Sequence, residues 1–445
     1  METIDLARLV AEAERLGARQ VEVLVIRGSY RYVEARNNKL DRIAHDTVTT
    51  VGVRVLVNGS VGSAGGEVSR PEDLQSLIEK AVSIARAGKG DWPGFNPDIG
   101  KGPETQVYDS ETASMSVEEV ADTLRNLLKE AARGDYVRVA SAAAEAEEIT
   151  VAYANSYGGP IEESYTTFSY GLELSAKTPE GEGTYTDYIV KSKYDYEEAR
   201  RLTALAVKRV LDAVKAKPLE TRRTTLILDA AEAASILDIM LSPAVSAEQV
   251  QEGRSPLAGR LGSLIFNERI SVYDDPAIPW EPGSRSFDSE GHPTVRKAIV
   301  EGGVLKTYLY DYYTAVRDGV ESTGNASRRR PWTKPTPQPT NLVLKVRDAK
   351  ATVEGLLAGV DEGVLVVSTI GSWMSNPVSG NVNATVTLGY IVRAGSLEAP
   401  VKGVTWGDDF YSALRERLAG AGGFECRSGV CTHALAIADT TLAGR

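Results

Sequence analysis

The sequence predicts an α+β protein in which two similar units, each a helix, an antiparallel sheet and a second helix, precede a larger β-rich C-terminal domain. Residues 1–220 show this succession of helical and alternating periodicities twice, and from about residue 221 strands and turns dominate. The 445 residues, 42% hydrophobic and 25% charged, suffice for several folded domains. We predict domain boundaries of 1–105, 106–220 and 221–445.

The first unit begins with a helical periodicity over 3–17 and closes on another over 71–88. Between them, valines alternate with Gly52, Arg54 and Leu56, which predicts a strand with one buried face. The dipeptide Asn58-Gly59 favours a hairpin turn, because both residues tolerate positive φ. The alternating valines are Val51, Val53, Val55 and Val57.

The second unit repeats this order, with helices predicted over 116–134 and 196–216 and alternating runs over 149–190. Each unit is expected to hold about four antiparallel strands. The alternative is two unrelated α+β units of similar composition. Residues 88–110, rich in Gly and Pro, read as a connector between the units.

The third domain opens on a buried strand and a helix within 224–242, and further helices are expected near 350–357 and 407–418. Residues 322–341 combine turn-forming residues, three arginines and several prolines. Because proline cannot donate a hydrogen bond to a sheet, this segment is expected to be an exposed loop.

Charge and hydropathy exclude two classes of partner. The net charge is −11, and the only dense basic run is Arg328-Arg329-Arg330, so no nucleic-acid partner is expected. No run of about eighteen apolar residues suggests a membrane span, and the N-terminus reads as an amphipathic helix, not a signal. The expected location is the cytoplasm.

Three separated blocks carry a family resemblance: 46–66 (DTVTTVGVRVLVNGSVGSAGG), 255–276 (SPLAGRLGSLIFNERISVYDDP) and 287–329 (beginning FDSEGHPTVRKAIVEGG). Together they resemble the TldD/PmbA family, and agreement of several blocks in order is more specific than one short motif. The resemblance implies two kinds of subunit. The TldD kind carries HExxxH and zinc, and the PmbA kind, also called TldE, lacks that motif and pairs with it.

Aligned on this resemblance, Ser242 and Ala247 stand where the two histidines of HExxxH would be, and Pro243 replaces the glutamate. Zinc needs imidazole, thiolate or carboxylate donors, and peptide hydrolysis needs a base for the bound water. We therefore expect no cofactor in this chain and zinc in the partner, with 239–262 serving as a scaffold helix. A Mg or Mn site on Glu248 and Glu252 is the alternative, but two carboxylates more often form a solvated helix face.

The C-terminal stretch 424–445 offers Cys426, Cys431 and His433. Their spacing permits a soft metal site, and the resemblance implies that a cysteine of this region completes the zinc site in the TldD kind. A redox pair or disulfide, and plain structural cysteines, are the alternatives.

Other polar residues are candidates for substrate or partner contact. Asp288 and Glu290 would point the same way if they lie on a strand, or would stabilise a turn with Gly291. Arg328 could pair with a substrate carboxylate or belong to a solvated loop. The polar side chains of a predicted turn before a strand could bind the backbone of an extended peptide, or only their own turn. These side chains are Asn376, Ser379 and Asn381.

The function expected from this reading is a non-catalytic TldE/PmbA-type subunit that forms a heterodimer with a TldD-type zinc metallopeptidase acting on unfolded or short peptides. One alternative is an autonomous metal-dependent hydrolase using Cys426, Cys431 and His433. Another is a homodimeric peptide-binding protein without hydrolysis. The family's older description as a modulator of DNA gyrase is given no mechanism, because the acidic chain lacks a nucleic-acid footprint.

Overall fold

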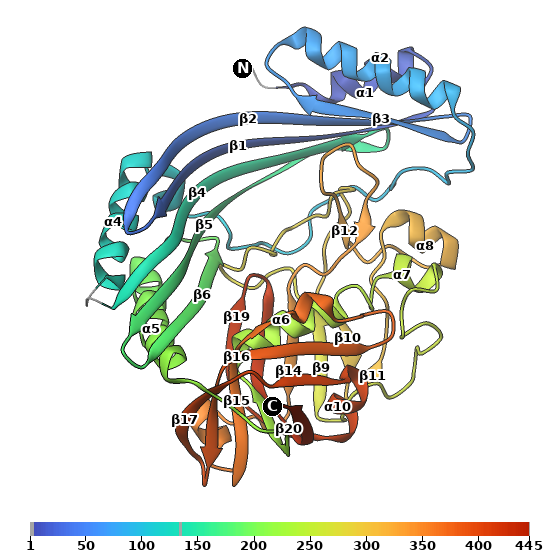
Figure 1. Ribbon diagram of the computed structural model, residues 1–445. Helices are drawn as coiled ribbons and strands as arrows, with labels where there is room; N and C mark the ends of the chain where they lie inside the picture. The colour runs from blue at the N-terminus through green and yellow to red at the C-terminus, as the bar shows by residue number, and fades with distance from the viewer. Residues whose placement is uncertain (1–3, 133–135, 445) are drawn as a thin grey trace.

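An arched antiparallel sheet of six strands dominates the first half of the chain in the computed structural model, which describes residues 4–132 and 136–444 (Figure 1). The strand order is β3-β2-β1-β4-β5-β6. The strands are β1 (Gln20–Arg36), β2 (Lys39–Val57), β3 (Ser60–Glu67), β4 (Val137–Asn155), β5 (Gly158–Thr178) and β6 (Gly181–Lys191). Each predicted unit therefore contributes three long strands instead of about four, and both units share one sheet through the antiparallel pairing of β1 with β4.

Helices cover the convex side of this arch at both of its ends (Figure 1). They are amphipathic: α2, for example, buries Ile78, Ala81, Val82 and Ala85, spaced along one helical face. The helices of this half are α1 (Leu6–Arg15), α2 (Pro71–Ala87), the short α3 (Ser110–Ser114), α4 (Val117–Ala131) and α5 (Tyr196–Lys215). Apart from α3, the order helix, three strands, helix occurs twice, so the repeated order was predicted but the number of strands was not.

The turn between β2 and β3 has the predicted geometry, with φ of 51° at Asn58 and 80° at Gly59. The valines of β2 pack under α1 and α2, as expected for one buried face. The opposite face is also buried, because the side chain of Arg54 is 2% exposed. The prediction of a single buried face was incomplete, since alternation within one strand does not reveal a second domain packed on the other side.

The second half forms a twelve-stranded sheet with the path β11-β10-β9-β14-β20-β8-β15-β16-β17-β7. Strand β18 pairs with both β16 and β20, so β20, β8, β15, β16 and β18 close into a small barrel. The strands are β7 (Lys217–Pro218), β8 (Arg222–Leu228), β9 (Ile270–Asp274), β10 (Lys297–Glu301), β11 (Val304–Leu305), β14 (Leu342–Val346), β15 (Glu362–Ile370), β16 (Asn381–Arg393), β17 (Ser396–Lys402), β18 (Thr405–Asp409), β19 (Leu418–Arg427) and β20 (Val430–Ala443). A separate hairpin pairs β12 (Ala326–Ser327) with β13 (Thr336–Pro337).

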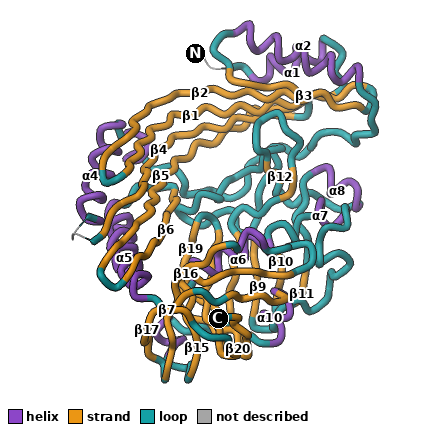
Figure 2. The backbone as a smooth tube through the Cα atoms, in the orientation of Figure 1, coloured by secondary structure: helices purple, strands orange, loops and turns teal. Residues whose placement is uncertain are grey.

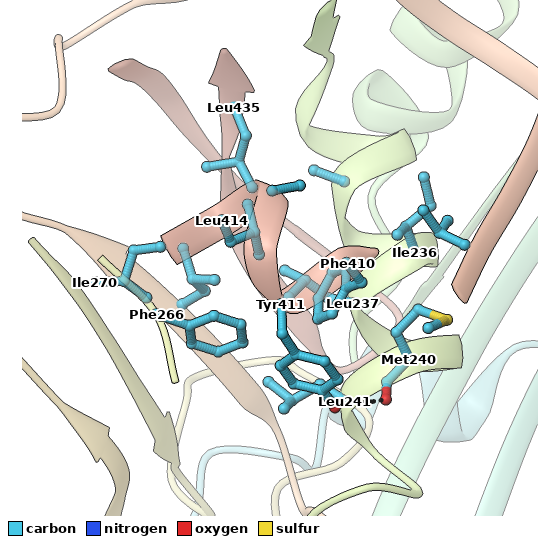
Figure 3. Packing of buried hydrophobic residues seen from close by; sticks show 14 of the residues in the cluster. Ile236, Leu237, Met240, Leu241, Phe266, Ile270, Phe410, Tyr411, Leu414 and Leu435 are labelled. Carbon is cyan, nitrogen blue, oxygen red and sulfur yellow. Dashed lines mark hydrogen bonds between the residues drawn. The ribbon is translucent and has the colours of Figure 1, made fainter. Parts of the chain in front are cut away.

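The largest hydrophobic core lies in this half, where α6 packs against the strands and against α10 (Figure 3). Met240 and Leu241 at the end of α6 are fully buried, and the Tyr411 hydroxyl donates a hydrogen bond to the Met240 carbonyl. The helices are α6 (Ala230–Leu241), α7 (Ala247–Gln251), α8 (Tyr312–Asp318), α9 (Val353–Leu357), the short 3-10 helix η1 (Ser372–Met374) and α10 (Phe410–Glu416). Among the residues described, no helix combines the length and apolar character needed to cross a membrane.

The loop that joins β12 to β13 reaches the concave side of the arched sheet (Figure 2). A Cβ on Gly52 of β2 would lie 2.2 Å from the carbonyl carbon of Pro331, and one on Gly65 of β3 would lie 2.2 Å from the ring of Trp332. The expectation of an exposed loop over 322–341 was therefore wrong at Pro331 and Trp332, whereas Arg329 and Arg330 are exposed. Proline keeps this segment out of a sheet ladder, but it does not prevent packing against another domain.

Candidate functional site

Residues 242–247 are a break between two helices. Ser242 caps the C-terminus of α6, where its Oγ donates a hydrogen bond to Asp238 Oδ1 at 2.8 Å, and Ala247 begins α7. Ala244, Val245 and Ala247 are at most 1% exposed and belong to the hydrophobic core. The expected scaffold helix over 239–262 is therefore not continuous.

This segment does not fit a zinc ion. The only side-chain donor at the three aligned positions, Ser242, Pro243 and Ala247, is the serine hydroxyl, which already pairs with Asp238. The nearby carboxylates each pair with a cation: Glu248 with Lys334 at 2.7 Å, and Glu252 with Arg254.

A buried ionic cluster lies where the concave face of the sheet meets the C-terminal domain. Glu22 accepts from Arg54 and, at 2.6 Å, from Arg328, and the Tyr153 hydroxyl donates to it at 2.9 Å. Burial favours the protonated carboxyl, but Arg328 and Arg54 outweigh it and hold the pKa of Glu22 below its usual value. The side chain of Arg328 is 2% exposed and joins the two halves of the molecule. It is therefore not a solvated loop residue.

Asp288 stabilises a turn. Its Oδ1 accepts from the backbone N–H groups of Glu290 and His292 at 2.8 and 3.0 Å, and its Oδ2 accepts from that of Ala326 at 3.0 Å. Glu290 Oε2 accepts from the backbone N–H of Tyr312 at 2.8 Å. The structure thus places Asp288 and Glu290 in a turn, where backbone donors engage both carboxylates.

Burial raises the pKa of Glu290 well above its usual value, and the nearby carboxylates Asp311 and Asp288 add to the effect. Burial likewise raises the pKa of Asp288. Oxygens of both side chains are engaged by backbone donors, which indicates a structural role in the turn.

A cavity of about 220 Å³ separates these loops from the sheet. Its apolar wall comes from β1 and β4, and its polar wall from the loop before Glu290. It is lined by Leu24, Ile26, Val151, Glu163, Tyr165, Pro282, Ser284, Arg285, Phe287, Asp288, Ser289, Ser327, Arg328 and Pro331. The structure brings the predicted residues Asp288 and Arg328 together at this cavity.

Asn376 and Ser379 lie in the turn that leads into β16, whose first residue is Asn381, and the three side chains bind within this turn. Asn376 Oδ1 accepts from the backbone N–H groups of Val378 and Ser379 at 3.0 and 3.3 Å, and Asn381 Nδ2 donates to Ser379 Oγ at 2.9 Å. The side chains thus serve their own loop in this structure.

A cleft of about 390 Å³ lies between β6 and the C-terminal domain. Strand β6 pairs only with β5, so its other edge carries no strand among the described residues. The cleft is lined by Thr184, Tyr185, Thr186, Asp187, Tyr188, Ala231, Glu232, Ser235, Val367, Ser368, Thr369, Ile370, Trp373, Thr387 and Arg427. Trp373 is 68% exposed there and Ile370 51%, which leaves apolar surface beside a free strand edge.

Cys426 and Cys431 face each other across β19 and β20 and form a disulfide. His433 is not brought to them. Its Nδ1 contacts the Gly423 carbonyl, and its ring lies 5.0 Å from that of Phe424. The carboxylate that approaches both sulfurs is Glu281.

The sequence reasoning missed Glu22, Arg54 and Glu281. For the first two a signal was present, because a charged residue interrupts an apolar run in VEVLVI (21–26) and VGVRVLV (51–57). A charge at the centre of a buried strand requires a partner, and so indicates an ion pair. Glu281 lies in an irregular loop, and nothing in its sequence context indicates proximity to Cys426.

Known proteins share this architecture over nearly the whole chain. TldE from Thermococcus kodakarensis superposes with a TM-score of 0.90 at 22% identity, covering 98% of this chain and 99% of that one. A proposed modulator of a DNA gyrase from Thermotoga maritima gives 0.88 at 24% identity, with the same coverage. At these identities the likeness shows the fold: an α+β protein with a curled N-terminal antiparallel sheet and a C-terminal domain rich in barrel strands.

Family models match three consecutive regions, described as PmbA/TldA metallopeptidase domain 1 (21–85), central domain (110–214) and C-terminal domain (221–444). These matches place the chain in the class of metallopeptidase homologues.

Curated relatives agree with this class. An uncharacterized protein of Methanocaldococcus jannaschii is 28% identical over 416 residues, covering 93% of this chain and 94% of that protein. The metalloprotease PmbA homolog of Haemophilus influenzae is 24% identical over 447 residues, covering 97% and 94%. The chain belongs to the PmbA/TldD family.

Proposed function

We propose that this chain is the non-catalytic, TldE/PmbA-type subunit of a metallopeptidase complex, and that its TldD-type partner holds the zinc. The observation that carries the proposal is the chemistry of 242–247. Where the resemblance calls for HExxxH, the chain offers a helix cap, a proline and buried alanines.

Catalysis by zinc at this position would require three protein donors and a general base. Ser242 and Ala247 supply no imidazole, Pro243 supplies no carboxylate, and Glu248 is held by Lys334. The structural neighbour from Thermococcus kodakarensis, named TldE, supports the subunit assignment.

The role of this subunit in the complex would be to hold unfolded or short peptides. The free edge of β6 supports this role, because an extended peptide can add to a strand edge through main-chain hydrogen bonds and place alternate side chains in neighbouring pockets. The cleft beside β6 offers Trp373 and Ile370 for such side chains. A homodimer of this chain that binds peptides without cleaving them is the second candidate, and it rests on the same cleft.

The test is to purify this chain and a TldD-type protein separately, mix them, and follow mass by size-exclusion chromatography with light scattering and activity with an unfolded peptide. We expect a heterodimer, chelator-sensitive cleavage by the mixture, and no cleavage by this chain alone.

Three results would count against the proposal. Failure to form the complex, with partner activity unchanged, removes the subunit role. Chelator-sensitive cleavage by this chain alone, free of contaminating proteases, would instead favour the autonomous hydrolase. If a homodimer binds the peptide without cleaving it, the second candidate holds.

A further inference from the structure

A carboxylate and two sulfurs meet at the junction of the sheet, the Glu281 loop and the β19–β20 hairpin. One ligand atom from each of Glu281, Cys426 and Cys431 lies within 4.8 Å of the other two. Glu281 is 3% exposed and Cys431 is fully buried, so two of the three groups are shielded from water.

We propose that Cys426, Cys431 and Glu281 form a binding site for a thiophilic divalent cation such as Zn²⁺, and that the Cys426–Cys431 disulfide is its closed, metal-free form. The site differs from the aligned HExxxH segment in every ligand. It is also independent of the subunit role proposed above, because it concerns groups of this chain alone.

The donor set suits zinc. Thiolate sulfur and carboxylate oxygen bind Zn²⁺ at about 2.3 Å and about 2.0–2.2 Å, and a tetrahedral arrangement puts such ligand atoms about 3.5–3.8 Å apart. The three ligand atoms already lie within 4.8 Å of one another, so only small movements separate them from such spacing once the S–S bond is broken. A water molecule can complete the four positions.

The charges also fit. A Zn²⁺ ion with two thiolates and one carboxylate carries one net negative charge, which is costly to bury without a counter-charge. The ammonium group of Lys191, at the end of β6, pairs with Glu281 and donates to the Cys426 carbonyl at 3.2 Å. Lys191 would therefore neutralise the loaded site. A carboxylate has about four lone-pair positions, so Glu281 can keep this partner while one oxygen binds the metal.

Opening the site takes a balanced exchange. A dithiol reductant breaks the S–S bond, gives its two electrons and two protons to the cysteine sulfurs, and leaves as its own disulfide. Binding of the cation then releases the thiol protons. In a reducing compartment, such as the cytoplasm that the sequence predicts, thiols are kept reduced and the site would be open.

Metal binding here would tie together three segments. The backbone N–H of Gly429, in the turn of the hairpin, donates to Glu281 Oε2 at 3.3 Å. The backbone N–H of Ser192, just after β6, donates to the Trp280 carbonyl at 2.9 Å. A cation on Glu281 and the cysteines would thus fasten the hairpin to the loop that holds the end of the sheet.

The test uses the full chain, reduced with a phosphine under anaerobic conditions, freed of reductant and metal, and titrated with Co²⁺ as a spectroscopic substitute for zinc. We expect one equivalent of Co²⁺ to give thiolate-to-metal charge-transfer absorption and tetrahedral d–d bands, and Zn²⁺ to abolish both. The oxidised protein should give neither. The Glu281→Gln variant should bind Co²⁺ at least about tenfold more weakly, because even groups outside the ligand set contribute about 10–100-fold to metal affinity.

The matched control is Glu425→Gln, which changes a carboxylate of the same hairpin that lies outside the three-residue cluster. It should keep the wild-type affinity. Circular dichroism checks folding of each variant. Cys431→Ser removes one of the two thiolates and should at least halve the charge-transfer band. The proposal is overturned if the reduced wild type shows no such band, if the band keeps its full intensity in Cys431→Ser, or if Glu281→Gln binds like the wild type.

Discussion

At the scale of single residues, the buried Glu22 cluster shows how charge holds the two halves together. Arg328 lies 306 positions from Glu22 in sequence, yet the two side chains form an ion pair in which both are almost fully buried. Without Arg328, Glu22 keeps Arg54 and Tyr153 as partners but loses one of its two buried cations, which costs more than loss of a surface pair.

We therefore predict that Arg328→Ala lowers the free energy of unfolding by about 3 kcal/mol, measured by urea denaturation. Its neighbour Arg329 is exposed, so Arg329→Ala serves as the control and should change stability by no more than about 0.5 kcal/mol. Equal effects of the two substitutions would contradict the assigned role of Arg328.

Glu147 on β4 gives a prediction about pH. Burial, with a smaller contribution from Glu145, raises its pKa from 4.5 to about 7. A raised carboxyl pKa in the folded state contributes stability that is fully present below the unfolded pKa and is lost as pH rises through the folded value. The loss therefore occurs between about pH 4.5 and 7.

Glu147→Gln should abolish this loss. The free energy of unfolding of the variant minus that of the wild type should therefore be larger at pH 8 than at pH 4 by about 1–3 kcal/mol. Thermal or urea unfolding across pH 4 to 8 measures the difference. A stability difference that stays constant over this range would show that Glu147 does not titrate as described.

At the scale of elements, the loop between β12 and β13 fastens the C-terminal domain to the arched sheet. Gly52 has room for no side chain, because a Cβ would collide with the backbone at Pro331. Gly66, on the neighbouring strand β3, would find nothing within 4 Å.

Gly52→Ala is accordingly expected to destabilise the protein by about 1–3 kcal/mol through overpacking, while Gly66→Ala should be tolerated. Differential scanning calorimetry compares the two variants. Should Gly52→Ala unfold at the wild-type temperature, the contact between the loop and β2 is looser than the structure indicates.

The same elements show what sequence reasoning can reach. The helices α2, α4 and α5 were predicted within a few residues, because their 3.6-residue periodicity and end signals are local. The pairing of β1 with β4 and the closing of the barrel by β18 could not be predicted, since they join distant segments with no local signal of register.

The candidate sites likewise combine features that the sequence predicts with contacts that it does not. The cysteines of 424–445 were found from residue chemistry and spacing, and the segment 242–247, which lacks zinc ligands, from the family resemblance. Glu281 was not predicted as the third group of the cluster, because His433 is nearer to the cysteines in sequence. The structure instead places the His433 ring against the Gly423 carbonyl. Three-dimensional proximity of residues in irregular loops is set by packing that the sequence does not display.

At the scale of the whole molecule, the cleft beside β6 exists only because both halves are present. One wall is the edge of the N-terminal sheet and the other is the end of β15 with η1. A peptide bound there would contact both domains.

Trp373→Ala should weaken binding of an unfolded peptide by about five- to tenfold or more, measured by isothermal titration, because an exposed tryptophan at a binding cleft typically contributes at least about 1 kcal/mol. Stability should be unchanged, since the side chain is 68% exposed. The control is Ile43→Ala, which truncates a side chain on β2, 50% exposed and absent from the cleft lining. Peptide affinity that falls equally in both variants would place binding elsewhere.

The pairing of β1 with β4 at the centre of the arched sheet also affects how the chain folds during its synthesis. Arg31 of β1 aligns with Ala146 of β4, so the inner edge of β1 has no partner until more than a hundred further residues have been synthesised. Such distant contacts raise contact order and slow folding, because the entropy of closing a long loop must be overcome first. The nascent first unit thus carries an unprotected strand edge, a target for chaperones and for aggregation, until β4 of the second unit has been synthesised.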